Sequence, residues 1–297
     1  GYGEAQYLLG YSYLNGLYFP VDTTKAMEYL YKAALQKVAP ACAIVGEAYE
    51  YGKYGFQNEP DSAIQFYYWG SESDDPICDY KIGSVLAYRG NIDGAVSYYM
   101  SAAKNGNLDA ALQVGKAYLN GQGIEADPKQ GFQIIRNLAE ENDHAEAYSV
   151  MGICYLSGFA VENDYDKAKQ SFEKAAELGS AAGNYFLAIC YQSGIGCDAD
   201  SLTGDAYLQK AIDMDYAPAT YHRGTLLSEQ GKEKEAFEYY QKAAEQGNEN
   251  AMLQVGLCYQ QGAGVPLNSK KAYEHFLQMS ENGYASGTFM VANCYIE

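Results

Sequence analysis

The chain has 297 residues, with 20 lysines and arginines against 38 aspartates and glutamates, which gives a formal net charge of -18 at pH 7. This acidic balance argues against nucleic acid as a partner, because binding to phosphate groups depends on basic side chains. The sequence also lacks any run of about eighteen apolar residues, so we expect no helix that inserts into a membrane.

A recurring pattern of a small residue, a glycine and a tyrosine organises the whole sequence. It is first seen at Ala5, Gly10 and Tyr13, and the same residues return at the same spacing from Ala41, Ala110, Ala147 and Ala251. Copies of this pattern, some with substituted residues, begin near positions 5, 41, 78, 110, 147, 183, 219 and 251, and a partial ninth copy begins at 287. Successive copies start 32 to 37 residues apart, and a period of this length predicts a solenoid of stacked repeats.

Each copy is expected to contain two short amphipathic helices, because its apolar and small residues recur at three and four positions. The first helix carries the small residue, the glycine and the tyrosine, and a loop that bears glycine follows it. The second helix comes after a residue suited to capping free backbone N–H groups. In chain order these capping residues are Asp22, Asp127, Asp164, Asp200 and Asn268.

The loops between the two helices of a copy fall into two kinds. Three copies have a Gly-x-Gly sequence, which supplies backbone freedom just after the first helix. These pairs are Gly121/Gly123, Gly194/Gly196 and Gly262/Gly264. The copies that begin at 78 and 219 are shorter, and tight turns are expected at residues 88–91 and 229–232.

Together these features resemble the Sel1-like repeat, a relative of the tetratricopeptide repeat. The matching pattern is Ala-x4-Gly-x2-Tyr-x2-Gly, a loop, Asp-x2-Lys-Ala and Ala-Ala-x2-Gly, with Lys25, Lys167 and Lys271 at the Lys-Ala position. The resemblance covers essentially the whole chain. It implies an all-α fold, a right-handed α-solenoid superhelix of about eight helix-turn-helix repeats plus a terminal helix. It also implies a concave face lined by first helices and a role as an adaptor for protein complexes.

The unbroken period predicts a single elongated domain over residues 1–297. Gly1 falls where a preceding copy would have its closing glycine, and Glu297 falls inside a ninth first helix. We therefore expect the sequence to be a fragment of a longer protein.

The pattern of the seven cysteines indicates whether the protein works in an oxidising or a reducing cellular compartment. Cys154, Cys190, Cys258 and Cys294 occupy one slot, immediately before the repeat tyrosine, and no predicted second helix contains a cysteine. The family resemblance implies that secreted members join the two helices of a repeat by a disulfide, and that framework is absent here. Small buried thiols are expected instead, with Cys197 the most exposed. Unpaired cysteines favour the cytoplasm, and a secreted or periplasmic location stays open.

The residue inventory does not support an enzyme. His144, His222 and His275 lie in different copies, and no catalytic triad, metal-binding pair or phosphate loop has a spacing that would bring its members together. Asp198 and Asp200 resemble the start of a calcium loop, but its glycine and terminal glutamate are missing. We therefore assign no catalytic residue, cofactor or metal.

Tyrosine, with 31 residues, is too frequent for the repeat pattern alone to explain. Positions two, six and nine after the start of a copy share one face of the first helix, which by analogy with tetratricopeptide repeats lines the concave groove. The predicted partner-binding residues on this face are Tyr7, Tyr11, Glu47, Glu50, Tyr80, Tyr185 and Tyr221. Such rings suit a peptide or protein with aromatic, aliphatic or basic side chains. The alternative is that neighbouring first helices bury these rings.

Other tyrosines occur as doublets on the second helices. In each doublet one ring is expected to pack inward and the other to face outward or sideways. The doublets are Tyr67-Tyr68, Tyr98-Tyr99 and Tyr239-Tyr240.

The sequence thus predicts a non-enzymatic scaffold or adaptor that binds a partner protein. One alternative is a structural spacer that self-associates through its repeat ends, and another is a secreted or periplasmic repeat protein for host interaction or regulation. The excess acid would attract a basic partner over a distance of about 8 Å at physiological salt. It would equally serve solubility alone.

Overall fold

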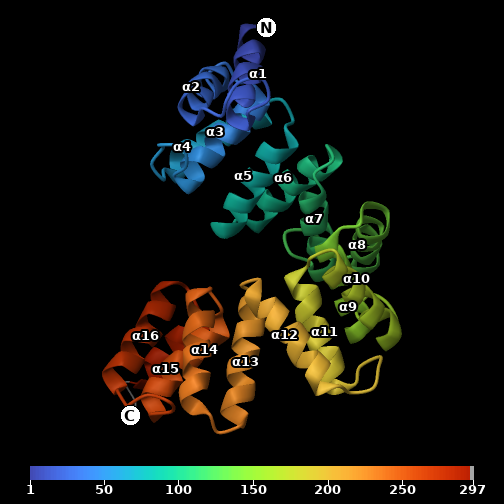
Figure 1. Ribbon diagram of the computed structural model, residues 1–297, viewed down its shortest axis with the longest axis vertical. Coiled ribbons are helices and arrows are strands. Elements are labelled where there is room, and N and C mark those ends of the chain that lie inside the picture. Colours follow the sequence, from blue (N-terminus) through green and yellow to red (C-terminus); the bar gives the residue numbers. More distant parts are fainter. Residues whose placement is uncertain (295–297) are drawn as a thin grey trace. The chain divides into compact units, whose positions relative to one another are not determined.

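The computed structural model describes residues 1–294, and this part of the chain contains helices and no strand (Figure 1). The helices are α1 (Tyr2–Asn15), α2 (Thr23–Ala34), α3 (Ala39–Tyr51), α4 (Pro60–Ser71), α5 (Pro76–Tyr88), α6 (Ile92–Lys104), α7 (Leu108–Asn120), α8 (Pro128–Asn142), α9 (Ala145–Ser157), α10 (Tyr165–Glu177), α11 (Ala181–Ser193), α12 (Ser201–Asp213), α13 (Ala217–Glu229), α14 (Glu233–Glu245), α15 (Glu249–Gln261), α16 (Ser269–Glu281) and α17 (Ala285–Cys294). Helices α1 to α16 form eight successive helical pairs, and α17 follows them. The predicted all-α repeat fold is therefore confirmed, while Tyr295 of the partial ninth copy lies outside the described residues.

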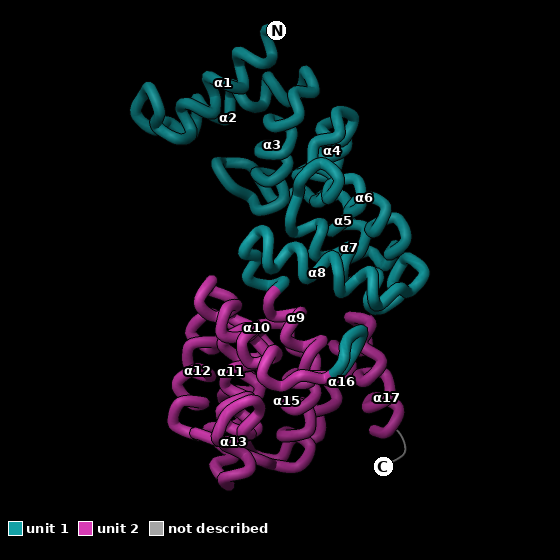
Figure 2. The backbone as a smooth tube through the Cα atoms, turned by 90° about the vertical axis from the view of Figure 1, so that its right-hand side faces the viewer, with its two compact units in different colours: residues 1–147, 158–162 teal, residues 148–157, 163–297 magenta. Residues whose placement is uncertain are grey.

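The chain divides into two compact units (Figure 2). Unit 1 consists of residues 1–147 and 158–162, and unit 2 of residues 148–157 and 163–297. Helices α1 to α8 belong to unit 1, and α10 to α17 belong to unit 2 together with most of α9. A single domain over the whole chain stays a prediction.

The predicted caps of the second helices are all present. In each case the side-chain oxygen of the capping residue accepts a hydrogen bond from the backbone N–H three residues further on, at 3.0 to 3.2 Å. The five capping residues are Asp22, Asp127, Asp164, Asp200 and Asn268. Each cap satisfies an N–H group that the helix itself leaves without a partner, which fixes where the second helix begins.

The Gly-x-Gly loops also serve the packing of one repeat on the next. Gly121 ends α7 in the left-handed conformation, with a φ of 67°, and Gly123 has a φ of 70°. A Cβ atom on Gly123 would lie 2.7 Å from the carbonyl oxygen of Ile92 at the start of α6. In unit 2 a Cβ atom on Gly196 would likewise lie 2.5 Å from the carbonyl oxygen of Tyr165. The loop of one repeat thus lies against the start of the preceding second helix, and only glycine leaves room for it.

In several repeats the recurring glycine of the first helix lies against an aromatic ring of the second helix, whereas Gly10 and Gly115 lie against Leu30 and Ile135. A Cβ atom on Gly83 would lie 2.7 Å from the ring of Tyr99, and one on Gly224 would lie 2.7 Å from the ring of Tyr240. The inner rings of the three doublets are therefore buried, as predicted. Their neighbours are more exposed: Tyr68 is 40% exposed, and Tyr98 and Tyr239 are half-buried.

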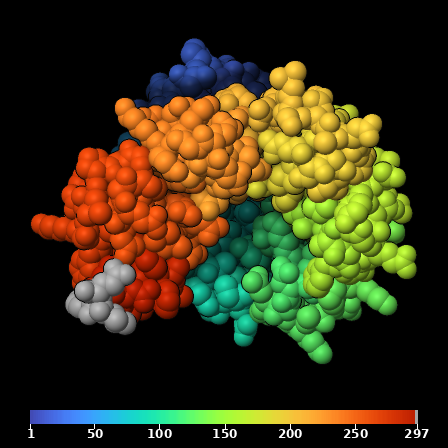
Figure 3. Space-filling view, turned by 90° about the horizontal axis from the view of Figure 1, so that it is seen from below, coloured from blue at the N-terminus to red at the C-terminus, as the bar shows by residue number. Residues whose placement is uncertain are grey.

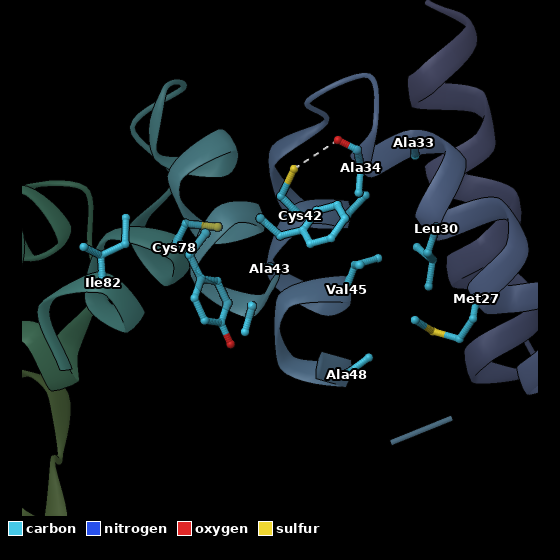
Figure 4. Close-up of a cluster of buried hydrophobic side chains, with 14 residues drawn as sticks. Met27, Leu30, Ala33, Ala34, Cys42, Ala43, Val45, Ala48, Cys78 and Ile82 are labelled. Atoms are coloured by element: carbon cyan, nitrogen blue, oxygen red, sulfur yellow. Dashed lines mark hydrogen bonds between the residues drawn. The ribbon is translucent and has the colours of Figure 1, made fainter. Parts of the chain in front are cut away.

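A large buried cluster of unit 1 joins α2, α3, α4 and α5 (Figure 4). Leu30 of α2, Val45 of α3 and Cys78 of α5 are all fully buried in it. The thiol of Cys42 donates a hydrogen bond to the carbonyl oxygen of Ala34, with a sulfur–oxygen distance of 3.5 Å. Because each cluster takes side chains from consecutive repeats, no repeat buries its apolar face alone. In unit 2, the repeats that contain α13 to α16 lie directly against one another (Figure 3).

Candidate functional site

The predicted partner-binding residues fall into two sets. Tyr7, Tyr11, Glu47, Glu50 and Tyr80 belong to unit 1, and Tyr185 and Tyr221 belong to unit 2. Each set lies on first helices, and the residues are described below unit by unit.

On α1, Tyr7 and Tyr11 stand one turn apart and their rings meet. The ring centroids are 5.8 Å apart and the planes are tilted by 41°. Tyr7 also packs against the buried cluster of unit 1, and burial raises the pKa of its hydroxyl. Tyr11 stays 40% exposed. The pair therefore offers one anchored ring and one ring that a partner can reach.

On α5, Tyr80 is held in a similar way. Its ring centroid lies 5.7 Å from that of Tyr99, the buried ring of the same repeat. Tyr80 is half-buried, and burial raises the pKa of its hydroxyl. Tyr80 thus contributes to packing and still presents part of its surface.

Glu47 and Glu50 at the end of α3 do not stand as free acids, because Lys81 of the next first helix lies between them. The Nζ atom of Lys81 is 3.3 Å from an oxygen of Glu47 and 3.0 Å from an oxygen of Glu50. The buried hydroxyl of Tyr67 donates a second hydrogen bond to Glu50 at 2.6 Å. The ring of Tyr51 lies beside them, with its centroid 5.0 Å from the Lys81 ammonium. We call Glu47, Glu50, Tyr51, Tyr67 and Lys81 the Lys81 cluster.

The electrostatics of the Lys81 cluster favour the charged pair. Burial alone would lower the pKa of Lys81, but its hydrogen bonds to Glu50 and Tyr51 outweigh burial and hold that pKa above the usual value. Burial would raise the pKa of Glu50, yet the hydrogen bonds from Tyr67 and Lys81 outweigh it and lower that pKa. Both groups are therefore ionised at neutral pH. Lys81 thus already balances part of the negative charge of Glu47 and Glu50, the two acids predicted to contact a partner.

In unit 2, Tyr185 of α11 stands at the centre of a group of rings. Its centroid lies 5.2 Å from Phe186, 5.6 Å from Tyr216 and 5.8 Å from His222. Tyr185 is half-buried, and burial raises the pKa of its hydroxyl. Tyr221 of α13 packs against the buried Tyr240, with centroids 5.6 Å apart.

All five predicted tyrosines thus share one arrangement, in which part of the ring packs on a neighbouring aromatic or core side chain. Four of them are half-buried and one is exposed. A ring fixed in this way loses little conformational entropy when a partner covers its remaining surface. The sequence leaves two alternatives for these rings, contact with a partner or burial between helices. The structure has features of both, because each ring packs on its neighbours and keeps part of its surface exposed.

Sequence reasoning missed Lys81, Tyr51 and Tyr67 as members of the cluster around the predicted acids. Lys81 lies 31 residues after Glu50, close to one repeat period. Comparing charged residues about one period apart would have suggested the pair, because equivalent positions in adjacent repeats are neighbours in a solenoid.

The described residues contain no group of three or more histidine, cysteine or acidic side chains that could hold a metal ion. Asp200 serves as a helix cap, as predicted. His144 lies 3.2 Å from Asp109 and accepts from the backbone N–H of Ala147. No helix within residues 1–294 is long and apolar enough to cross a membrane.

The seven cysteines all lie in the described part of the chain and are unpaired there. Cys154, Cys190 and Cys258 are buried, as predicted, whereas Cys294 of the same slot is partly exposed, like Cys197. Burial raises the pKa of Cys154 and Cys190 to about 11. These thiols are therefore poor nucleophiles in the folded protein.

The geometry defines a helical-repeat protein with half-buried aromatic residues on its first helices. The family model of the Sel1 repeat matches seven segments, residues 3–38, 39–70, 108–143, 145–180, 181–216, 217–248 and 250–284. The chain therefore belongs to the Sel1 repeat family, whose members generally mediate protein–protein interactions. Residues 71–107 lie between matched segments, yet they hold the helical pair α5 and α6.

Similar proteins include two named regulators. The chain is 23% identical over 287 residues to Chitin synthase regulatory factor 3 of Schizosaccharomyces pombe, covering 89% of this chain and 31% of that protein. It is 24% identical over 292 residues to Chitin synthase regulator SKT5 of Saccharomyces cerevisiae, covering 95% of this chain and 38% of that protein. The chain thus spans about a third of the length of these relatives.

Among solved structures, c5321, a protective antigen present in uropathogenic Escherichia coli strains, is similar over 99% of this chain and 64% of that chain. The TM-score is 0.60 and the sequence identity is 27%. That antigen displays an SLR fold.

Proposed function

We propose that this chain is a non-catalytic scaffold that binds a partner protein through the half-buried tyrosines of its first helices. The observation that carries the proposal is the shared arrangement of Tyr7, Tyr80, Tyr185 and Tyr221, each packed on another ring with part of its surface free. Aromatic rings that are held rigid and partly exposed are typical anchors of protein interfaces.

The partner is expected to be a protein segment with aromatic, aliphatic or basic side chains. The net charge of -18 attracts basic segments, and cations stack favourably on tyrosine faces. The protein itself already uses this contact, because Lys53 and Lys81 both lie within 5.0 Å of the centroid of the Tyr51 ring. The names of the two curated relatives support a regulatory complex as the setting.

Self-association is a second candidate function, which one observation favours. The loop between α1 and α2 exposes four consecutive or nearly consecutive apolar side chains, Leu17, Tyr18, Phe19 and Val21, with Tyr18 at 84% exposure. An exposed apolar patch of this kind is typical of a protein contact. Concentration-dependent assembly in sedimentation velocity, abolished by Tyr18→Ser and Phe19→Ser, would support this candidate.

The test of the main proposal begins with affinity capture from a lysate of the source cell. Hydrogen exchange of the purified complex then locates the contact. We expect protection in first helices, with α1 and α5 as the reporters of unit 1 and α11 and α13 as those of unit 2. Protection confined to second helices would overturn the assignment to the tyrosines of the first helices.

A further inference from the structure

A cavity of about 240 Å³ opens between α14, α15 and α16 of unit 2. Val255 and Met279 are 2% exposed and supply an apolar floor together with Met252 and Ala244. Polar side chains, among them Glu245, stand around this floor. An apolar base with a few polar groups at its edge is the composition of a small binding site.

The repeat architecture places a similar crevice between α10, α11 and α12, and the two differ in chemistry. Its lining residues lie 68 positions earlier in the sequence, as Ala176 does with respect to Ala244. There the floor includes the buried Asn184, whose side chain donates to the carbonyl oxygen of Ser180 at 2.9 Å, and Lys210 adds a cation. In the later cavity Met252 replaces that asparagine, Gln278 replaces that lysine and Gln241 replaces Glu173. The substitutions make this cavity apolar at its base and leave Glu245 as the one carboxylate among its described lining residues.

The polar groups of the cavity indicate what it would bind. Glu245 is exposed and is the only carboxylate among the lining residues that the structure describes, which include no lysine or arginine. Burial lowers the pKa of His275, so this ring is neutral at pH 7. Gln278 and Asn282 each carry a carboxamide, a group with both donors and an acceptor that suits the peptide backbone. The cavity is therefore complementary to an apolar side chain next to a cation.

We propose that this cavity receives one aliphatic side chain of an extended, basic segment of a partner protein. The side chain rests on Met252, Val255 and Met279, and Glu245 attracts a neighbouring lysine or arginine. The flexible methionines adapt to the shape of the inserted group. This inference rests on the protein-binding function proposed above, and it adds a contact formed by α14, α15 and α16 to the contacts of the predicted tyrosines.

The test uses protein labelled with carbon-13 at the methionine methyl groups and the probe peptide acetyl-Ala-Lys-Leu-Arg-Ala-amide. We expect the methyl signals of Met252 and Met279 to shift saturably during titration, while those of Met27 and Met151 stay in place. A peptide with glycine in place of leucine should bind about tenfold more weakly, because glycine has no side chain that could bury apolar surface in the cavity. Equal affinity for the two peptides, or unshifted Met252 and Met279 signals, would overturn the proposal.

The earlier crevice supplies matched control variants. Ala244→Leu should fill the cavity and weaken peptide binding about tenfold, whereas Ala176→Leu should leave it unchanged. If Ala244→Leu lowers the melting temperature, the surface variant Glu245→Gln decides instead, with Glu177→Gln as its control. Glu245→Gln should weaken binding and reduce its dependence on salt, and equal effects of the two glutamine variants would contradict the proposal.

The outcomes also separate this inference from the function on which it rests. A protein that binds its partner through the first-helix tyrosines, but shows no shift of Met252 and Met279, overturns the cavity site alone. A protein that shows these shifts, but whose partner protects none of α1, α5, α11 and α13, overturns the tyrosine assignment alone.

Discussion

Gly224→Ala sets two physical effects of opposite sign against each other. In an isolated helix alanine is more favourable than glycine by about 1 kcal/mol. In this protein, however, the new Cβ atom would lie 2.7 Å from both Cδ1 and Cε1 of Tyr240, whereas ordinary contacts begin near 3.4 Å. Tyr240 is only 5% exposed and packs against Tyr221, so its ring has little room to withdraw.

Overpacking of a core typically costs about 1 to 3 kcal/mol, and the close contact with a buried ring places this site toward the upper end of that range. Subtracting the gain in helix propensity leaves an expected net loss of about 1 to 2 kcal/mol in the free energy of unfolding. Urea unfolding followed by far-ultraviolet circular dichroism measures this change, as a lower midpoint with an unchanged slope.

A double-mutant cycle identifies the ring as the cause. In a Tyr240→Leu background, where no ring occupies the space, Gly224→Ala should become neutral or stabilising. A Gly224→Ala variant that is more stable than the parent protein would refute the reasoning, because helix propensity would then outweigh packing at the recurring glycine.

Three further predictions follow from local contacts. Asp164→Ala removes the cap of α10 and should cost about 1 kcal/mol in thermal or urea unfolding, while Asp164→Asn should be nearly neutral. Lys81→Met leaves Glu50 without its cation and should cost about 2 kcal/mol at neutral pH. Because the pKa of Glu50 is lowered in the folded state, its stabilising contribution is present above the unfolded value of about 4.3 and is lost as the pH falls through the folded value. The parent protein and Lys81→Met should therefore converge in acid, and a constant difference down to acid pH would contradict this assignment. Iodoacetamide at mildly alkaline pH should modify Cys197 before Cys42, because burial raises the pKa of the Cys42 thiol to about 11, and mass spectrometry of peptide fragments gives the order.

Much of the fold could be predicted because its signals are local in the sequence. Asp164 precedes α10 by one residue and caps it, so its role depends only on neighbouring backbone. Gly123 and Gly196 likewise stand at fixed places in the repeat. The period then extends each local assignment along the chain, since equivalent residues in a solenoid have equivalent surroundings.

The surroundings of the candidate site could not be predicted to the same degree. Glu50 was expected to face a partner, but its nearest cation is Lys81 of the next repeat. That pairing depends on the register between adjacent first helices, which no single motif encodes. The cavity around Met252 arises similarly, because three helices contribute to it and one substitution in the floor changes its polarity.

The measurement that tests the central claim most directly is the affinity of the captured partner for a variant with alanine at Tyr7, Tyr80, Tyr185 and Tyr221. The control carries alanine at Tyr68 and Tyr98, on the second helices, and both proteins must retain helical content and cooperative unfolding. Loss of anchoring rings typically costs about 1 kcal/mol or more each, so we predict a weakening of at least about tenfold for the first variant and little change for the control. Equal affinity of the two variants for the partner would contradict the account.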